Sequence, residues 1–172
     1  MPYQVEAIAN RFLAIARSSG EPLDPMKIQK LVYFAHGWHL GLGGGPLCAD
    51  RVEAWRWGPV FPELYHCVKR WGNRAIRKPL EIRDFDGRHY RWTTPEVSGE
   101  PDFSRRVIQR VWDVYGHMSG WALSQLTHEK GTPWDKIRAS YPGMRDVEIP
   151  NELIQQYFEE KARSVRAARA GE

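Results

Sequence analysis

Two histidines three residues apart, His36 and His39, have a spacing that could support chemistry. On a helix this spacing places two imidazole rings on one side, where they could bind a metal ion. No carboxylate or third histidine accompanies them at a known ligand spacing, so hydrogen-bonded positions at the edge of the core explain them better. A hydrolase centred on His36, His39 and His128 is the catalytic alternative. We expect no metal and no cofactor.

Other nucleophile and phosphate-binding patterns are weak. Cys67 directly follows His66, and adjacent residues on a helix point in different directions, so they do not form a nucleophile–base pair. The sequence has no serine elbow, paired-carboxylate site or zinc-protease spacing. The glycines at 43–45 end a helical pattern instead of opening one, which argues against a phosphate loop. The sequence therefore predicts a protein that is not an enzyme.

Single-stranded nucleic acid is the second ligand to consider. Trp55, Arg56 and Trp57 resemble a platform on which bases could stack. Basic residues follow at Lys69, Arg70, Arg74, Arg77 and Lys78. In the competing interpretation, the tryptophans belong to the core and the basic residues lie on a solvent-exposed face. Because the formal net charge is only +4, from 25 basic and 21 acidic residues, a nucleic-acid-binding regulator is kept as the alternative function.

Length and composition describe the domain that must position these residues. A chain of 172 residues can bury roughly 70 % of its unfolded surface in one core. The two cysteines, Cys48 and Cys67, lack a Cys-x-x-Cys pattern and are expected to be reduced thiols. No export signal or membrane-spanning run is evident, so we expect a cytoplasmic protein without a membrane partner. We expect one domain over residues 1–165 and a frayed basic tail over 166–172.

A helix at about residues 25–42 is predicted to be the central buried element. Asp24 is a suitable N-cap, Pro25 suits the first helical position, and Gly41 favours its end. Apolar residues on several sides predict that other elements pack around it. Four polar or amphipathic side chains interrupt this apolar coat and are the first candidates for function. They are Lys27, Lys30, Tyr33 and His36.

The remaining pattern predicts further helices and small antiparallel pieces. Helices are expected at about 5–17, 62–71, 103–115, 121–130, 132–139 and from 150 onward. Asp102 is predicted to cap the third of these, whose buried face would carry Phe103, Val107, Val111, Val114 and Tyr115. An extended segment is expected at 52–57, closed by a turn at Gly58-Pro59. The predicted fold class is mainly α with a small antiparallel β component, α+β.

A β-hairpin is predicted at about residues 80–93, around Asp86-Gly87. A two-residue loop would divide the apolar residues between both faces. A three-residue loop at 85–87 would pair Ile82 with Tyr90, and Leu80 with Trp92, on one face. We therefore predict the three-residue loop.

Two sequence blocks in this order resemble the Panacea antitoxin domain, the family of SocA-like antitoxins and phage-associated GepA-like proteins. The first is Met-Lys-Ile-Gln-Lys-Leu-Val-Tyr-Phe-Ala-His-Gly-Trp-His-Leu at 26–40, followed by Pro46-Leu47. The second is Val-Glu-Ala-Trp-Arg-Trp-Gly-Pro-Val at 52–60. Leu-Thr-His-Glu at 126–129 and Pro133-Trp134 are also similar to the family's pattern. The resemblance extends from the first helix to about Ala139.

This resemblance implies a non-catalytic bacterial or prophage-associated antitoxin that neutralises a protein toxin by direct contact. In SocA-like members it also implies an adaptor that delivers the toxin to an ATP-dependent protease; a homodimer is left open. Trp, Tyr and Arg are common anchors of protein interfaces. The expected contact residues are Lys30, Tyr33, His36, Trp55, Arg56, Thr127, His128 and Trp134. The expected scaffold residues are Leu31, Trp38, Gly58 and Pro59.

Overall fold

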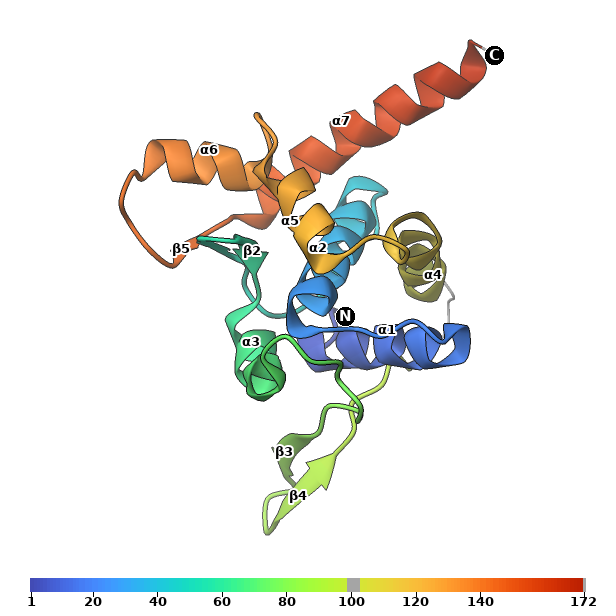
Figure 1. Cartoon of the computed structure of the whole chain (residues 1–172), viewed down its shortest axis with the longest axis vertical. Helices are drawn as coiled ribbons and strands as arrows, with labels where there is room; N and C mark the ends of the chain where they lie inside the picture. Colours follow the sequence, from blue (N-terminus) through green and yellow to red (C-terminus); the bar gives the residue numbers. More distant parts are fainter. Residues whose placement is uncertain (99–102, 172) are drawn as a thin grey trace.

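The predicted central helix is the element around which the other helices are arranged. The computed structural model describes residues 1–98 and 103–171. Its helix α2 (Pro25–Gly41) begins where Asp24 accepts a hydrogen bond from the backbone N–H of Lys27 at 2.9 Å, with Pro25 in the first turn. Both predicted start signals are confirmed. Neighbouring helices cover α2 on several sides (Figure 1).

The other helices of the described chain mostly pack against α2. Those in contact with it are α1 (Val5–Ser19), α3 (Pro62–Val68), α4 (Phe103–Tyr115), α5 (Gly120–His128) and α7 (Asn151–Ala170). The other helical elements are the 3-10 turn η1 (Lys69–Trp71) and α6 (Pro133–Ser140). Thr132 caps α6 by accepting from the backbone N–H of Asp135 at 3.2 Å. The mainly α fold with a small antiparallel β component is confirmed.

One helix prediction needs correction. On α4 the residues buried are Val107, Ile108, Val111 and Trp112, whereas Val114 is exposed. The tail from residue 166 onward is exposed and is assigned to α7 as far as Ala170. The predicted cap Asp102 and the final residue Glu172 lie outside the described residues.

A three-stranded antiparallel sheet with the order β2-β1-β5 lies beside the helices. Its strands are β1 (Glu53–Trp55), β2 (Gly58–Val60) and β5 (Val147–Glu148). The predicted turn at Gly58-Pro59 is wrong, because Trp55 pairs with Gly58 and residues 56 and 57 form the turn. Gly58 has φ +103°, a backbone conformation that a side chain disfavours, and it starts the returning strand.

The second hairpin, β3 (Ile82–Phe85) and β4 (Tyr90–Thr93), has neither of the registers considered from the sequence. Phe85 pairs with Tyr90, and Ile82 pairs with Thr93, so residues 86–89 form the loop. The Asp86 carboxylate holds this loop by accepting from the backbone N–H groups of Arg88 and His89 at 2.9 and 2.8 Å. The predicted register is wrong because most of the hairpin is exposed, so burial of an apolar face does not select the pairing.

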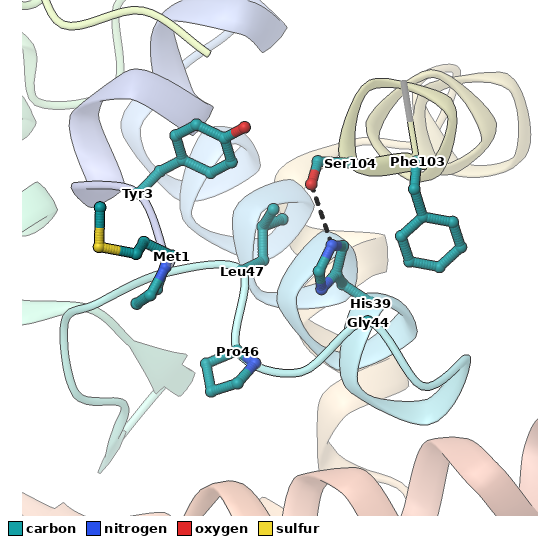
Figure 2. A pocket seen from close by; sticks show the side chains of 9 residues that line it. Met1, Tyr3, His39, Gly44, Pro46, Leu47, Phe103 and Ser104 are labelled. Carbon is teal, nitrogen blue, oxygen red and sulfur yellow. Dashed lines mark hydrogen bonds between the residues drawn. The ribbon is translucent and has the colours of Figure 1, made fainter. Parts of the chain in front are cut away.

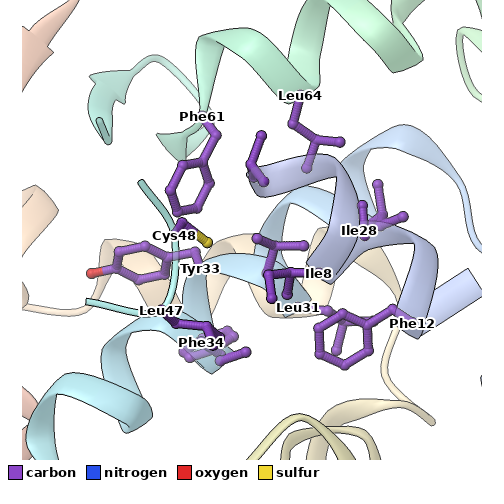
Figure 3. Packing of buried hydrophobic residues seen from close by; sticks show 14 of the residues in the cluster. Ile8, Phe12, Ile28, Leu31, Tyr33, Phe34, Leu47, Cys48, Phe61 and Leu64 are labelled. Carbon is purple, nitrogen blue, oxygen red and sulfur yellow. The ribbon is translucent and has the colours of Figure 1, made fainter. Parts of the chain in front are cut away.

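One part of the core lies between α1, α2 and α3. Ile8 and Phe12 of α1 lie beside Ile28 and Leu31 of α2, and Leu64 approaches from α3 (Figure 3). All five side chains are fully buried. Burying a side chain of this size contributes about 1.5–3 kcal/mol relative to leaving it exposed.

Helices α2 and α7 approach each other closely at two glycines one turn apart. A methyl group at Gly37 would overlap the ring of Phe158. A methyl group at Gly41 would lie 2.6 Å from the carbonyl carbon of Phe158 and 2.9 Å from the backbone nitrogen of Glu159. The absence of side chains at both positions therefore creates the space that α7 occupies.

Candidate functional site

A buried lysine of α2 forms a hydrogen bond to the β1–β2 hairpin. Lys30 is only 2 % exposed, and its Nζ donates to the carbonyl oxygen of Pro59 at 2.9 Å. Burial lowers the pKa of Lys30 to about 7, because the charged amine loses its water shell. Gly58 leaves room for it, since a methyl group there would lie 2.9 Å from Nζ and 2.5 Å from the Thr127 hydroxyl.

Side chains from α5 and α6 hold the remaining carbonyl groups of the same turn. Ser124 donates to the carbonyl oxygen of Trp57 at 2.8 Å. Trp134 Nε1 donates to the carbonyl oxygen of Trp55 at 2.7 Å. His128 lies against the ring of Trp134, with ring centroids 4.0 Å apart, and its Nε2 is 3.3 Å from the carbonyl oxygen of Arg56. The turn is thus fixed to three separate helices.

Four predicted contact residues are buried in the protein. Lys30 and Thr127 are each 2 % exposed, Tyr33 is 2 % exposed and His36 is fully buried. In the folded chain these four side chains are therefore not part of the accessible surface, and Lys30 and His36 form hydrogen bonds within the domain, to Pro59 and Asn151. The scaffold residue Leu31 is also fully buried, and Trp38 Nε1 donates to the Tyr115 hydroxyl at 3.3 Å.

The accessible residues gather around the turn and form what we call the hairpin surface. Its members are Trp55, Arg56, Trp57, Trp121, His128 and Trp134. Two of them were not among the predicted contacts: Trp57, which is 46 % exposed, and Trp121, which is 55 % exposed. Their rings lie 5.8 Å apart, centroid to centroid. The spacing of Trp121 had indicated a supporting role in its helix, because periodicity does not show which face a neighbouring element leaves open.

The exposed rings of the hairpin surface are already in contact with each other and with a cation. The Arg56 guanidinium lies 4.7 Å from the ring centroid of Trp57. Trp55 meets Tyr65 in an edge arrangement at 4.8 Å. Open ring faces that could stack successive bases are therefore reduced, which does not favour the nucleic-acid platform. Large, pre-positioned rings beside arginine suit a protein interface.

His36 has both ring nitrogens engaged within the protein. The backbone N–H of Cys48 donates to Nδ1 at 3.1 Å, so the proton resides on Nε2, which donates to the Asn151 side-chain oxygen at 2.8 Å. Burial lowers the pKa of His36 to about 4. This neutral histidine joins α2 to the start of α7 and to the segment before β1.

His39 lies in a different place, at a cavity of about 450 Å³ beside the N-terminal segment. Figure 2 shows Ser104 pointing toward His39; the distance from its hydroxyl to Nε2 is 3.0 Å. The other ring nitrogen, Nδ1, donates to the carbonyl oxygen of Gly45 at 2.7 Å. In a nucleophile–base pair, a carboxylate usually stabilises the protonated imidazole. At His39, burial instead lowers the pKa and so disfavours the protonated ring. The His39–Ser104 contact therefore fits a structural hydrogen bond, which links the turn at Gly45 to α4, better than it fits a catalytic pair.

Metal ligation and membrane insertion gain no support from the described residues. Within 1–98 and 103–171, no three histidine, cysteine, aspartate or glutamate side chains gather closely enough to hold a metal ion. In the same part of the chain, the helices lack the combined length and apolar character needed to cross a membrane.

The buried amine of Lys30 predicts an unusual dependence of stability on pH. Below pH 7 the amine is protonated in both the folded and unfolded chains, and its burial lowers the free energy of unfolding. Above pH 7 the folded chain releases this proton, whereas the unfolded chain keeps it up to the ordinary lysine pKa of 10.5. The unfolded chain then binds more protons, so stability rises with pH, by about 1.4 kcal/mol per pH unit.

The experiment is urea unfolding at pH 7, 8 and 9 for the wild type and for Lys30→Met. Burial also raises the pKa of Cys48 and of Cys67 above the ordinary thiol value of 9.0. Above pH 9 the unfolded chain loses these thiol protons while the folded chain keeps them, which lowers stability as pH rises. The measurement is therefore limited to pH 7–9. We expect the wild type to gain about 2–3 kcal/mol relative to Lys30→Met between pH 7 and 9. Parallel curves for the two proteins would contradict a buried, titrating Lys30.

Comparison with known proteins identifies relatives of this chain. A family model described as "Antitoxin SocA-like, Panacea domain" matches residues 28–135, which include the hairpin surface and Lys30. The chain is also similar to Antitoxin SocA from Caulobacter vibrioides (strain NA1000 / CB15N), with 37 % identity over 142 residues, covering 80 % of this chain and 71 % of that protein. No solved structure matches the chain.

Proposed function

Because the chain belongs to the SocA-like Panacea antitoxin family, we propose that it is an antitoxin that neutralises a protein toxin by binding it through the hairpin surface. The supporting observation is the construction of the turn. Side chains from α2, α5 and α6 hold the carbonyl groups of residues 55–57 and 59. A rigid aromatic turn loses little conformational entropy when a partner covers it, and this favours tight binding.

Neutralisation of this kind requires no chemistry from the protein itself. Trp57 and Trp121 supply large apolar area, and Arg56 supplies a charge beside them. We further propose that the protein acts in the cytoplasm as an adaptor that delivers the bound toxin to an ATP-dependent protease. This proposal rests on its similarity to a protein named for antitoxin activity, and it requires a toxin-binding surface that stays accessible in the folded chain.

Co-expression with the product of the neighbouring gene tests this function. The neighbouring product alone should stop growth, and co-expression of the antitoxin should restore it. The toxin's half-life separates the two modes of neutralisation: it should shorten on co-expression and lengthen again when the ATP-dependent proteases are deleted. An unchanged half-life with restored growth would indicate steric inhibition. Failure to bind or rescue any adjacent gene product would overturn the antitoxin proposal.

A further inference from the structure

A second exposed apolar region lies away from the hairpin surface, between the C-terminal end of α2, helix α4 and the C-terminal half of α7. It is a groove of about 550 Å³. Leu42 is 41 % exposed, Val114 is 41 % exposed and Val165 is 46 % exposed, and all three line this groove. Each comes from a different segment. Exposed apolar residues that converge from separate elements mark an interaction site more strongly than single exposed residues do.

The floor of the groove continues the aromatic packing of the core. Trp38, Phe103 and Tyr115 contribute their rings, and Val107 and Val111 lie between them on α4. Figure 1 shows that the C-terminal half of α7 projects beyond the body of the domain, where it forms one wall of the groove. The apolar floor with helical walls has the form that accepts an amphipathic helix.

Three arginines contribute to the charge of the groove. Arg110 lies on α4, and Arg166 and Arg169 lie three residues apart on α7, a spacing that places this pair along one side of the helix. Among the described residues that line the groove, none is acidic. Guanidinium groups bind carboxylates in a paired geometry, so an acidic ligand complements both edges.

From these observations we infer that the groove binds an amphipathic helix of a partner protein, with an apolar stripe in the groove and carboxylates along its edges. A second copy of this chain fits less well, because a symmetric contact would place arginines against arginines. A nucleic-acid strand would leave the apolar floor without a matching surface, and a bilayer cannot enter a concave groove as a helix can.

The groove is separate from the hairpin surface. Trp38 and Leu42 lie at least two helical turns along α2 from Lys30, or about 12 Å at 1.5 Å per residue. Binding at the groove therefore goes beyond the toxin contact proposed above and can be tested without a toxin. An antitoxin with two independent surfaces could hold two proteins at the same time.

The test uses two fluorescent helical peptides of about 18 residues, long enough to form a helix in solution. Both carry leucines at positions i, i+3, i+4 and i+7; one has glutamates beside this stripe and the other has lysines. Fluorescence anisotropy with the full chain should show binding of the glutamate peptide and at least about tenfold weaker binding of the lysine peptide. Equal binding of both peptides, or binding of neither, would overturn the inference.

Two pairs of substitutions locate the binding. Val165→Asp should weaken binding of the glutamate peptide at least about tenfold, whereas Ser164→Asp, which introduces the same charge at an adjacent exposed position outside the groove, should change it less than about threefold. In the second pair, Arg166→Glu should weaken binding of the glutamate peptide, and Arg163→Glu, at an exposed position outside the groove, is its control. Circular dichroism checks that each variant is folded, and Val114→Asp on α4 replaces any α7 variant that is not.

Competing ligands are measured with the same variants. Anionic lipid vesicles and a single-stranded oligonucleotide should bind weakly and should not respond to Val165→Asp. If either ligand binds more tightly than the glutamate peptide and loses affinity on Val165→Asp, the groove is a lipid or nucleic-acid site and the inference is wrong. Dimerisation of the wild type that Val165→Asp abolishes would likewise assign the groove to a second copy.

Discussion

Replacing Gly37 with alanine is expected to lower the free energy of unfolding by about 3 kcal/mol, because the added methyl group would overlap the ring of Phe158. The gain in helix propensity from glycine to alanine, at most about 1 kcal/mol, opposes this loss but is smaller. Urea unfolding gives the free energy in water. An unchanged or higher value for Gly37→Ala would contradict the close packing of α2 on α7.

A double-mutant cycle shows whether Phe158 is the cause. Phe158→Ala alone should cost about 3–5 kcal/mol, since it removes a fully buried ring. The added cost of Gly37→Ala should shrink to less than about 1 kcal/mol in the Phe158→Ala background. Gly41→Ala is the matched control, because its methyl group would meet the backbone of α7 and not the ring. Its cost should therefore persist when the Phe158 ring is removed.

The largest functional effect is expected from removing the two exposed rings of the hairpin surface. Trp57→Ala combined with Trp121→Ala should abolish rescue from the toxin, because buried tryptophans commonly contribute 2 kcal/mol or more each to a protein interface, roughly 30-fold in affinity. Both side chains are about half exposed before binding, so their removal should change stability by less than about 1 kcal/mol. The measurement is growth on co-expression, with protein levels checked by immunoblot.

A structural explanation of lost rescue can be separated from a contact effect. Gly58→Ala would disturb the turn itself, since its methyl group would lie 2.5 Å from the Thr127 hydroxyl, and it should reduce both stability and rescue. The double tryptophan variant should reduce rescue alone. Full rescue by that variant would show that the toxin binds elsewhere.

The helical part of the fold was predictable because its signals are local. Asp24 and Pro25 mark the start of α2, and Thr132 and Pro133 mark the start of α6. The β5 strand has only two residues, too few to form an alternating pattern. The β3–β4 register depends on hydrogen bonds of the Asp86 carboxylate, whereas the sequence argument assumed a buried face.

Some residues that the sequence singles out for the site are buried in the folded chain, and the sequence could not show this burial. The sequence singled out Lys30 and His36 as polar groups in an apolar helix, and polar groups are usually exposed. Their hydrogen-bond acceptors, the carbonyl oxygen of Pro59 and the side-chain oxygen of Asn151, are 29 and 115 residues further along the chain. Only the folded chain brings these partners near enough to permit burial. The turn residue Arg56 and its neighbour Trp55 could be singled out because they stand in a distinctive aromatic run.

The most direct test of toxin binding through the hairpin surface is the affinity of the purified toxin for three forms of the protein, measured by isothermal titration calorimetry. The forms are the wild type, Trp57→Ala and the control Trp92→Ala, which removes an exposed tryptophan of the β3–β4 hairpin. We predict that Trp57→Ala raises Kd about 30-fold and that Trp92→Ala changes it less than about threefold. Wild-type affinity for Trp57→Ala, with a large loss for Trp92→Ala, would contradict the account and assign the toxin to the other hairpin.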